Sequence, residues 1–322
     1  MTSSMPRRLA TTSGGEVSYL DAGSGRPVVL LHGFPLSSHL WRHVIPALAV
    51  RMRVVAPDLP GCGASVPAPG ARLDLRSQAR YVRELLDALD VGSFAVVGHG
   101  AGGAVAQLMA AAPEPSTIVA DAARGGVDAM VLIDSATADS WPPRRLADLL
   151  DEALRSRSPS SAAGAVAAAL ELGLGSGRAP SAEDVREYWR PFEGSAGAVA
   201  FERGAAALDA SALAGIGPSL AALEAPALLL WGEDDPLVPP EAAERLQEGM
   251  PSAALALLPG VGHVPPEEAP DTVASLVGEW LRARYLREGH QHAPAGPVVV
   301  SVGRRPPPEA EFTGESFDGE DD

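Results

Sequence analysis

Lysine is absent from this sequence, and cysteine and aromatic residues are scarce. All 25 basic residues among the 322 are arginine, which we interpret, together with the many alanines, glycines and prolines, as a coding bias. The lone cysteine, Cys62, excludes a disulfide framework and any metal site built from several cysteines. Aromatic residues make up only 5% of the chain, but the hydrophobic fraction of 46% is large enough for a sizeable core.

Long apolar runs are also lacking. No stretch approaches the roughly 18 consecutive apolar residues that a membrane span needs, and no apolar run follows the arginines near the start. We therefore expect no signal peptide, no membrane partner and a cytoplasmic location. The formal net charge of −16 argues against a nucleic-acid partner. Nothing in the sequence indicates a particular oligomeric state.

What the chain does contain is an alternation of short apolar runs and longer segments with helical spacing. This alternation predicts an α/β fold, in which a mostly parallel central sheet is flanked by helices. The expected strands are residues 28–32, 53–56, 94–98, 129–133, 227–231 and 254–258. The expected helices are residues 75–89, 102–112, 240–249 and 270–284.

A long interruption separates the fourth and fifth of these strands. Its helical pieces, residues 144–156, 162–172 and 182–188, are broken by glycine, serine and proline, and a segment of this length is too long for a simple crossover. We predict a helical cap at 138–223 on a core formed by 16–137 and 224–286. Residues 287–322 are polar, proline-rich and finally acidic, which predicts a disordered tail.

The string FAVVGHGAGG at 94–103 carries the most information about chemistry. A strand that meets a helix through such a glycine-rich turn is the setting of a nucleophile elbow, with the helix N-terminus favouring negative charge. A phosphate-binding loop is the alternative, but neither the spacing nor the residues that follow fit a Walker A loop. No dinucleotide fingerprint and no metal cluster is visible, so we expect no cofactor and no metal.

Three further strings follow expected strands. In LLHGFP at 30–35, the turn directs backbone N–H groups above the sheet, and the N–H groups of Phe34 and Ala101 are candidates for an oxyanion hole. In WGEDDPLVP at 231–239, the acid Asp235 follows a buried strand. In PGVGH at 259–263, His263 lies in a loop bounded by glycines.

Taken in this order, the four strings resemble the α/β-hydrolase superfamily from about residue 17 to residue 284. The HGFP turn, SHLW at 38–41 and the elbow string look most similar to the epoxide hydrolase and haloalkane dehalogenase branch, and DLPGCG at 58–63 matches a loop common in that fold. The resemblance implies that Asp235 is the acid and His263 the base of a catalytic triad. It also implies a small-molecule substrate, with Trp41, His99, Trp141 and Tyr188 as candidate substrate contacts.

The chain departs from this family at the nucleophile. Gly100 stands where the family has Ser, Asp or Cys, and a glycine has no side chain with which to attack a substrate. Shifting the register does not help, because His99 and Ala101 are the neighbours. Cys62 is an alternative nucleophile, although a small buried thiol more often packs in a core.

Several of these residues also have a purely structural interpretation. Asp235 also suits a helix cap near residue 240, and Asp134, which follows an earlier strand, is an alternative acid. His32 and His99 also suit a role in holding their loops, and Tyr188 suits packing between cap and core.

Three functions remain open at this point. The first is an enzyme in which the His263–Asp235 pair acts as a general base in water attack, elimination or cyclisation on a small apolar substrate. The second is an ordinary esterase, epoxide hydrolase or dehalogenase inactivated by Gly100. The third is a ligand-binding protein on a hydrolase fold.

Overall fold

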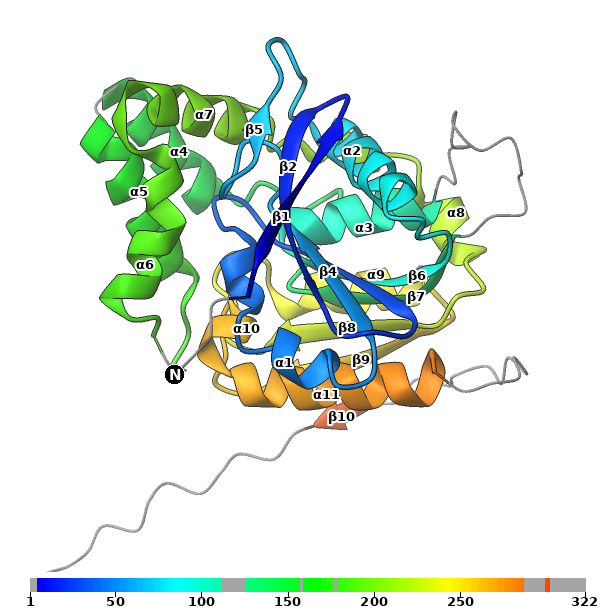
Figure 1. Ribbon diagram of the computed structural model, residues 1–322. Coiled ribbons are helices and arrows are strands. Elements are labelled where there is room, and N and C mark those ends of the chain that lie inside the picture. Colours follow the sequence, from blue (N-terminus) through cyan, green and yellow to red (C-terminus); the bar gives the residue numbers. More distant parts are fainter. Residues whose placement is uncertain (1–4, 112–125, 157–158, 177–178, 287–298, 302–322) are drawn as a thin grey trace, which may run out of the picture.

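A ten-stranded sheet forms the centre of the protein in the computed structural model, which describes residues 5–111, 126–156, 159–176, 179–286 and 299–301 (Figure 1). The strand order is β1-β2-β4-β3-β6-β7-β8-β9-β10, with β5 paired to β2. From β4 to β10 all neighbouring strands run parallel, whereas β2 is antiparallel to β1, β4 and β5. The strands are β1 (Arg7–Thr12), β2 (Gly15–Ala22), β3 (Pro27–Leu31), β4 (Arg53–Pro57), β5 (Val66–Pro67), β6 (Phe94–His99), β7 (Val127–Ile133), β8 (Ala227–Gly232), β9 (Ala253–Leu258) and β10 (Val299–Ser301).

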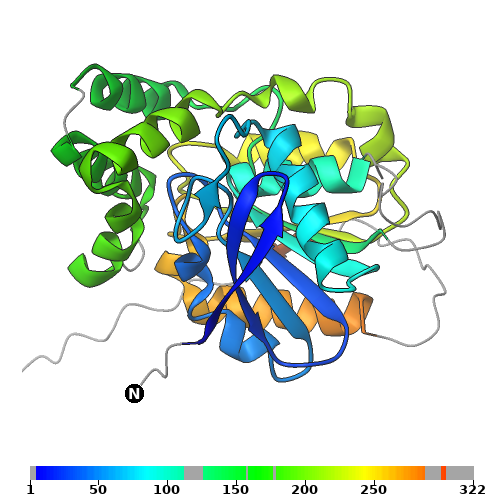
Figure 2. The same cartoon turned by 45° about the horizontal axis from the view of Figure 1, so that its top comes forward.

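Helices cover both faces of this sheet. Helices α1 and α11 pack against each other on one face, and α2, α3 and α8 lie on the opposite face (Figures 1 and 2). The core helices are α1 (Ile45–Leu48), α2 (Leu75–Ala88), α3 (Ala101–Ala111), α8 (Gly217–Ala221), α9 (Pro240–Glu248), α10 (Pro265–Glu268) and α11 (Pro270–Arg284). Short 3₁₀ helices are η1 (Ser38–Trp41), η2 (Arg190–Phe192) and η3 (Ala210–Leu213). No described helix has the length and apolar character needed to cross a bilayer.

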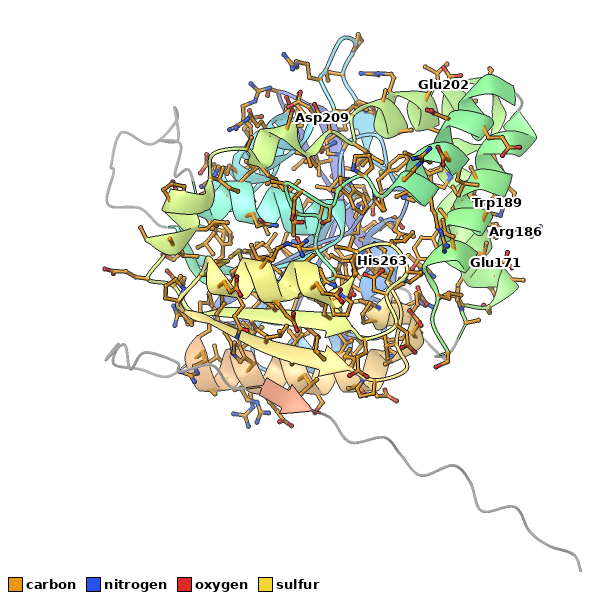
Figure 3. The ribbon with its side chains drawn as sticks, turned by 180° about the vertical axis from the view of Figure 1, so that it is seen from behind. Glu171, Arg186, Trp189, Glu202, Asp209 and His263 are labelled. Atoms are coloured by element: carbon orange, nitrogen blue, oxygen red, sulfur yellow. The ribbon has the colours of Figure 1, made fainter. Side chains whose placement is uncertain are left out.

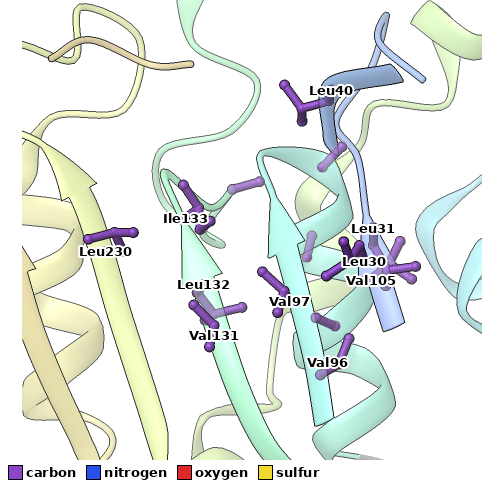
Figure 4. Packing of buried hydrophobic residues seen from close by; sticks show 14 of the residues in the cluster. Leu30, Leu31, Leu40, Val96, Val97, Val105, Val131, Leu132, Ile133 and Leu230 are labelled. Atoms are coloured by element: carbon purple, nitrogen blue, oxygen red, sulfur yellow. The ribbon is translucent and has the colours of Figure 1, made fainter. Parts of the chain in front are cut away.

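The core lies between the central strands and α3. Strands β3 and β6 present apolar side chains on both faces, and Val96, Val97, Leu30 and Leu31 are fully buried beside Val105 of α3 (Figure 4). Continuous apolar strands of this kind are what a parallel sheet covered on both faces requires. The predicted fold class is therefore confirmed, and each of the six predicted strands coincides with an observed one to within two residues at either end.

The cap consists of α4 (Arg144–Ser156), α5 (Pro159–Gly173), α6 (Ala182–Trp189) and α7 (Gly194–Ala206), inserted between β7 and β8 (Figures 1 and 2). Its observed end differs from the predicted boundary at residue 223. Both η3 and α8 pack against α3 of the core, so the insertion rejoins the core soon after α7.

The ends of the sheet also differ from the sequence prediction. Strand β1 precedes residue 16, and its exposed, alternating side chains gave no buried-strand signal. Within the predicted disordered tail, Val299–Ser301 form β10 and extend the parallel sheet beside β9, so the prediction does not hold for these three residues. Residues 287–298 and 302–322 of that tail lie outside the described part of the chain.

A buried ion pair joins the cap to the core. Arg42, just after η1, donates to both carboxylate oxygens of Glu267 in α10, at 2.5 and 2.7 Å. Tyr188 of α6 donates its hydroxyl hydrogen to the same carboxylate, and Asp184 of α6 pairs with Arg42 at 3.1 Å. The Glu267 side chain is only 1% exposed, so it relies on these partners in place of water.

We expect Glu267→Ala to lower the free energy of unfolding by about 3 kcal/mol, because it leaves the Arg42 guanidinium in a mostly buried site without its main partner. The midpoint of urea unfolding measures this loss. The exposed Glu279, which bonds only Ser275, provides the control, and Glu279→Ala should change stability by no more than about 0.5 kcal/mol. Equal stabilities for the two variants would contradict a structural role for the ion pair.

Candidate active site

Five loops meet at the carboxyl edge of the parallel strands, on the side that faces the cap. They follow β3, β6, β7, β8 and β9 and carry Phe34, Gly100, Asp134, Asp235 and His263, respectively. Figure 3 shows His263 at this edge, between the strands and the cap helices. Open α/β sheets place ligand sites at this edge because the loops that leave parallel strands converge there.

His263 and Asp235 form a hydrogen-bonded pair. His263 Nδ1 lies 2.8 Å from Asp235 Oδ2, and both side chains are almost fully buried. The other carboxylate oxygen, Oδ1, accepts hydrogen bonds from the backbone N–H groups of Leu237 at 2.7 Å and Val238 at 2.9 Å. These bonds fix the carboxylate, so a proton on Nδ1 has an acceptor and Nε2 is left as the basic nitrogen.

The loop that carries His263 is itself held by neighbouring groups. The backbone N–H of His263 donates to Gly173 O at the end of α5, at 2.6 Å. The Glu268 carboxylate accepts from the N–H groups of Gly262 and Val264, and burial raises the pKa of Glu268 despite these bonds. The Trp141 indole stacks on the imidazole with ring centroids 6.0 Å apart. The ring is therefore fixed in both position and tilt.

Asp134 and Asp235 lie close together, but their pKa values shift in opposite directions. Burial, and then the Asp235 charge, raise the pKa of Asp134 well above its ordinary value, although Gly232 N–H donates to it at 2.9 Å. Burial also acts to raise the pKa of Asp235, but the positive charge and hydrogen bond of His263 outweigh it and lower that pKa. Asp134 therefore gives up its proton less readily than Asp235. This difference favours Asp235 over Asp134 as the partner of His263.

Gly100 forms the turn between β6 and α3, facing His263. Its φ of +53° lies in the left-handed region, where side chains are strained. A Cβ built on Gly100 would lie 3.7 Å from His263 Nε2 and 3.6 Å from Gly33 Cα. Gly102 allows α3 to approach β3, since a Cβ there would lie 2.4 Å from Leu31 O. The glycines thus shape a turn whose open side faces the imidazole.

A pocket with about 370 Å³ of empty space lies above this turn. Its floor includes Phe34, His99, Gly100 and His263, and its remaining walls are mostly apolar: Gly33, Pro35, Leu36, Trp141, Leu146, Ala169, Leu170, Leu237 and Val264. We call it the His263 pocket. Ala101 is the first residue of α3, so its N–H is one of those that a helix leaves without an internal acceptor, but Ala101 lines a second cavity and not this pocket. The pocket thus combines a base with an apolar wall.

Two of the four expected substrate contacts line this pocket. Trp141 lines it through its indole, whose Nε1–H has no hydrogen-bond partner among the described residues. His99 lines it too, and burial first, then the His263 charge, lower its pKa to about 3, so its Nε2–H donates to His263 O at 2.7 Å. His99 therefore both holds the loop and borders the pocket.

The other two expected contacts do not line the pocket, which corrects the prediction. Trp41 is fully buried in the core, because η1 packs against the end of the sheet. Tyr188 is 1% exposed and donates to Glu267 at the cap–core boundary. Cys62 borders a different cavity, and burial raises the pKa of its thiol, so it does not act as a replacement nucleophile here.

Sequence reasoning missed the cap side of the site and one supporting acid. Leu146 of α4 and Ala169 and Leu170 of α5 face the pocket, and nothing in a single helical pattern tells which face meets a distant loop. Glu268 was also missed. Its position five residues after His263, inside a turn dense in N–H groups, was the only signal available.

One group among the described residues has the composition of a metal site. Donor atoms of Asp134, Asp235 and His263 lie within 4.8 Å of one another. The facing atoms of Asp235 and His263 are already joined by their hydrogen bond, and burial raises the pKa of Asp134, which disfavours its charged form. This arrangement suits an acid–base pair better than a cation, which requires deprotonated ligands.

Comparison with known proteins agrees with this geometry. The family described as alpha/beta hydrolase fold matches residues 26–270. Haloalkane dehalogenase 2 of Mycobacterium tuberculosis is 32% identical over 83% of this chain and 92% of its own length. A soluble epoxide hydrolase of Corynebacterium sp. strain C12 is 45% identical over 106 residues, which is 33% of this chain and 37% of that enzyme.

Solved structures support the same fold. An α/β-hydrolase-fold protein from Burkholderia ambifaria superposes with a TM-score of 0.74 at 24% identity, covering 84% of this chain and 97% of its own. The epoxide hydrolase CorEH superposes with a TM-score of 0.67 at 26% identity, covering 88% of this chain and 99% of its own. The chain belongs to the α/β-hydrolase fold family, as a relative of epoxide hydrolases and haloalkane dehalogenases.

Proposed function

We propose that this protein is a hydrolase-family enzyme that works without a covalent intermediate, using His263 and Asp235 as a general base on a small apolar substrate. The observation that carries the proposal is the position of Gly100. A Cβ at this position would lie 3.7 Å from His263 Nε2, at ordinary contact distance, where members of this family are expected to hold their nucleophile. A water molecule or a substrate hydroxyl in the unfilled space would pass its proton to the base from about 2.6–3.2 Å.

In ester hydrolysis, the oxygen of that water attacks the carbonyl carbon while its proton passes to His263 Nε2. The developing imidazolium is stabilised by Asp235 through the 2.8 Å bond to Nδ1. Negative charge on the carbonyl oxygen would be met by the N–H groups of Phe34 and Ala101, as in an oxyanion hole. The protonated His263 then returns its proton to the leaving alkoxide, which gives an acid, an alcohol and the starting enzyme.

The substrate class follows from the walls of the His263 pocket. Leu36, Leu146, Leu170 and Leu237 favour a small apolar molecule. The names of the relatives suggest epoxides, haloalkanes and esters as the electrophiles to test. Elimination or cyclisation, in which Nε2 removes a C–H or O–H proton, fits the same base. A cytoplasmic location remains part of this proposal.

The test compares the chain as written with His263→Ala on a panel of short esters, epoxides and haloalkanes. We expect turnover of at least one class, and a decrease in kcat of about 10²–10⁴-fold in the variant, because general-base assistance is lost. Replacement of the exposed His43 by alanine is the matched control and should leave kcat unchanged.

Intact-mass spectrometry during turnover separates this mechanism from a covalent one. We expect no substrate adduct on the protein as written. A stable adduct, or turnover that survives His263→Ala, would overturn the proposal. Absence of turnover on the whole panel, with a ligand retained in the pocket, would instead favour a binding protein.

A further inference from the structure

A second cavity shares Phe34 with the His263 pocket. It has about 390 Å³ of empty space, part of it open to solvent, and residues from the β3–η1 and β4–β5 loops, α2, α3 and α7 line it. Phe34 lines both this cavity and the His263 pocket, and its ring packs against Phe192 and Phe201 near the cap. We call this space the Gln78 cavity, after the polar side chain in its wall.

Gln78 brings an unsatisfied acceptor to this cavity. The side chain is 7% exposed, and its Nε2 donates to Pro60 O at 3.0 Å and to Leu73 O at 3.4 Å. These two carbonyl groups fix the orientation of the amide. The oxygen, Oε1, is buried and has no hydrogen-bond partner among the described residues. An unpaired buried acceptor of this kind destabilises a protein unless a ligand or water supplies a donor.

The other polar groups of the wall carry no charge. His32 has both ring nitrogens occupied, with Nδ1–H donating to Gly33 O and Nε2 accepting from Leu59 N–H, each at 2.9 Å. Burial lowers the pKa of His32, and burial raises the pKa of the Cys62 thiol, so both are neutral at pH 7. The described lining contains no Asp, Glu, Lys or Arg. An ionic ligand would therefore enter without a counter-charge.

We propose that the Gln78 cavity binds a small neutral alcohol, whose hydroxyl donates to Gln78 Oε1 while its alkyl chain contacts Leu73, Leu75 and Val105. The apolar wall selects the chain, and the single free acceptor selects the hydroxyl. This cavity shares Phe34 with the His263 pocket and is also lined by Ala101, but binding of the alcohol requires no chemistry at His263.

The test uses two isomers of the same formula, 1-butanol and methyl propyl ether. Only the alcohol has a hydrogen-bond donor. Ligand-observed NMR titration of the full chain should show saturable binding of both, with the alcohol about threefold to tenfold tighter, which corresponds to one neutral hydrogen bond. Absence of saturable binding, or equal affinities for the two isomers, would overturn the proposal.

Three variants locate the site. Gln78→Met keeps the side-chain volume and should abolish the preference for the alcohol. Ala207→Leu fills the Gln78 cavity from the end of α7 and should abolish binding of both isomers, which keeps the test decisive if Gln78→Met does not fold. Ala169→Leu fills the His263 pocket instead and should leave both affinities unchanged. Binding lost only in Ala169→Leu would place the alcohol in the His263 pocket and refute the proposal.

Discussion

Replacing Asp235 with asparagine is expected to lower kcat about 10⁴-fold while the fold is retained, the size of loss seen when the aspartate of a serine-protease triad is changed in this way. The reason lies in how the structure fixes this side chain. Oδ1 accepts from two backbone N–H groups, those of Leu237 and Val238, so the amide oxygen of the variant would occupy that position. The amide NH₂ would then face His263 Nδ1.

In that orientation the amide stabilises the imidazole tautomer that cannot act as a base at Nε2. Nδ1 must accept from the new amide, so the ring proton moves to Nε2, which faces Gly100 and can no longer take a proton from water. Steady-state kinetics on the best substrate of the panel measures the loss in kcat. Circular dichroism and the urea midpoint check that the fold persists.

Asp134→Asn is the matched control. Burial raises the pKa of Asp134, which favours its neutral form, and Asp134 accepts from Gly232 N–H, a bond that an asparagine oxygen preserves. We expect a decrease in kcat of less than about tenfold, the effect of one neutral hydrogen bond. The reverse pattern, with Asp134→Asn inactive and Asp235→Asn active, would make Asp134 the partner of His263 and refute the present assignment.

The two acids show what the sequence revealed and what it did not. Asp235 and His263 were assigned through the resemblance to the α/β-hydrolase superfamily, and the parallel strands that precede them bring their two loops to one edge. The raised pKa of Asp134 was not predictable from the sequence. It depends on complete burial beside another carboxylate, and both conditions arise from packing between β7 and β8.

The cap shows the opposite outcome. Its helices α4, α5 and α6 were predicted to within three residues at either end, whereas Tyr188 lies at the cap–core boundary, the alternative that the sequence left open beside substrate contact. The partners of that tyrosine, Glu267 and Arg42, lie 79 and 146 residues away, and no local pattern reports such a contact. Trp41 was misplaced for the same reason, since a motif shared with a family gives a position in the chain and not the direction of a side chain.

Introducing serine at Gly100 has the largest expected gain in activity. A Cβ at this position lies 3.7 Å from His263 Nε2, so a suitable rotamer brings Oγ within hydrogen-bonding distance of the base. We expect Gly100→Ser to hydrolyse an activated ester such as p-nitrophenyl acetate at least about 100-fold faster than the chain as written. This gain stays well below the roughly 10⁶-fold in kcat that loss of a catalytic serine costs in subtilisin.

The gain should come with a covalent intermediate and a loss of stability. A burst of p-nitrophenol and an acetyl adduct on Ser in the variant would report acyl transfer, since the hydroxyl attacks the ester carbonyl and the phenolate leaves. A side chain at a φ of +53° is strained, so the free energy of unfolding should decrease by about 1–2 kcal/mol.

Gly100→Ala is the matched control, because it introduces the same strain without a hydroxyl. It should lose the same stability, show no burst and form no adduct. If serine and alanine behave alike in the ester assay, residue 100 does not face the base as the geometry requires. If the chain as written shows no activity on any substrate and only the serine variant hydrolyses the ester, Gly100 has inactivated an ordinary hydrolase. That result would refute direct water attack.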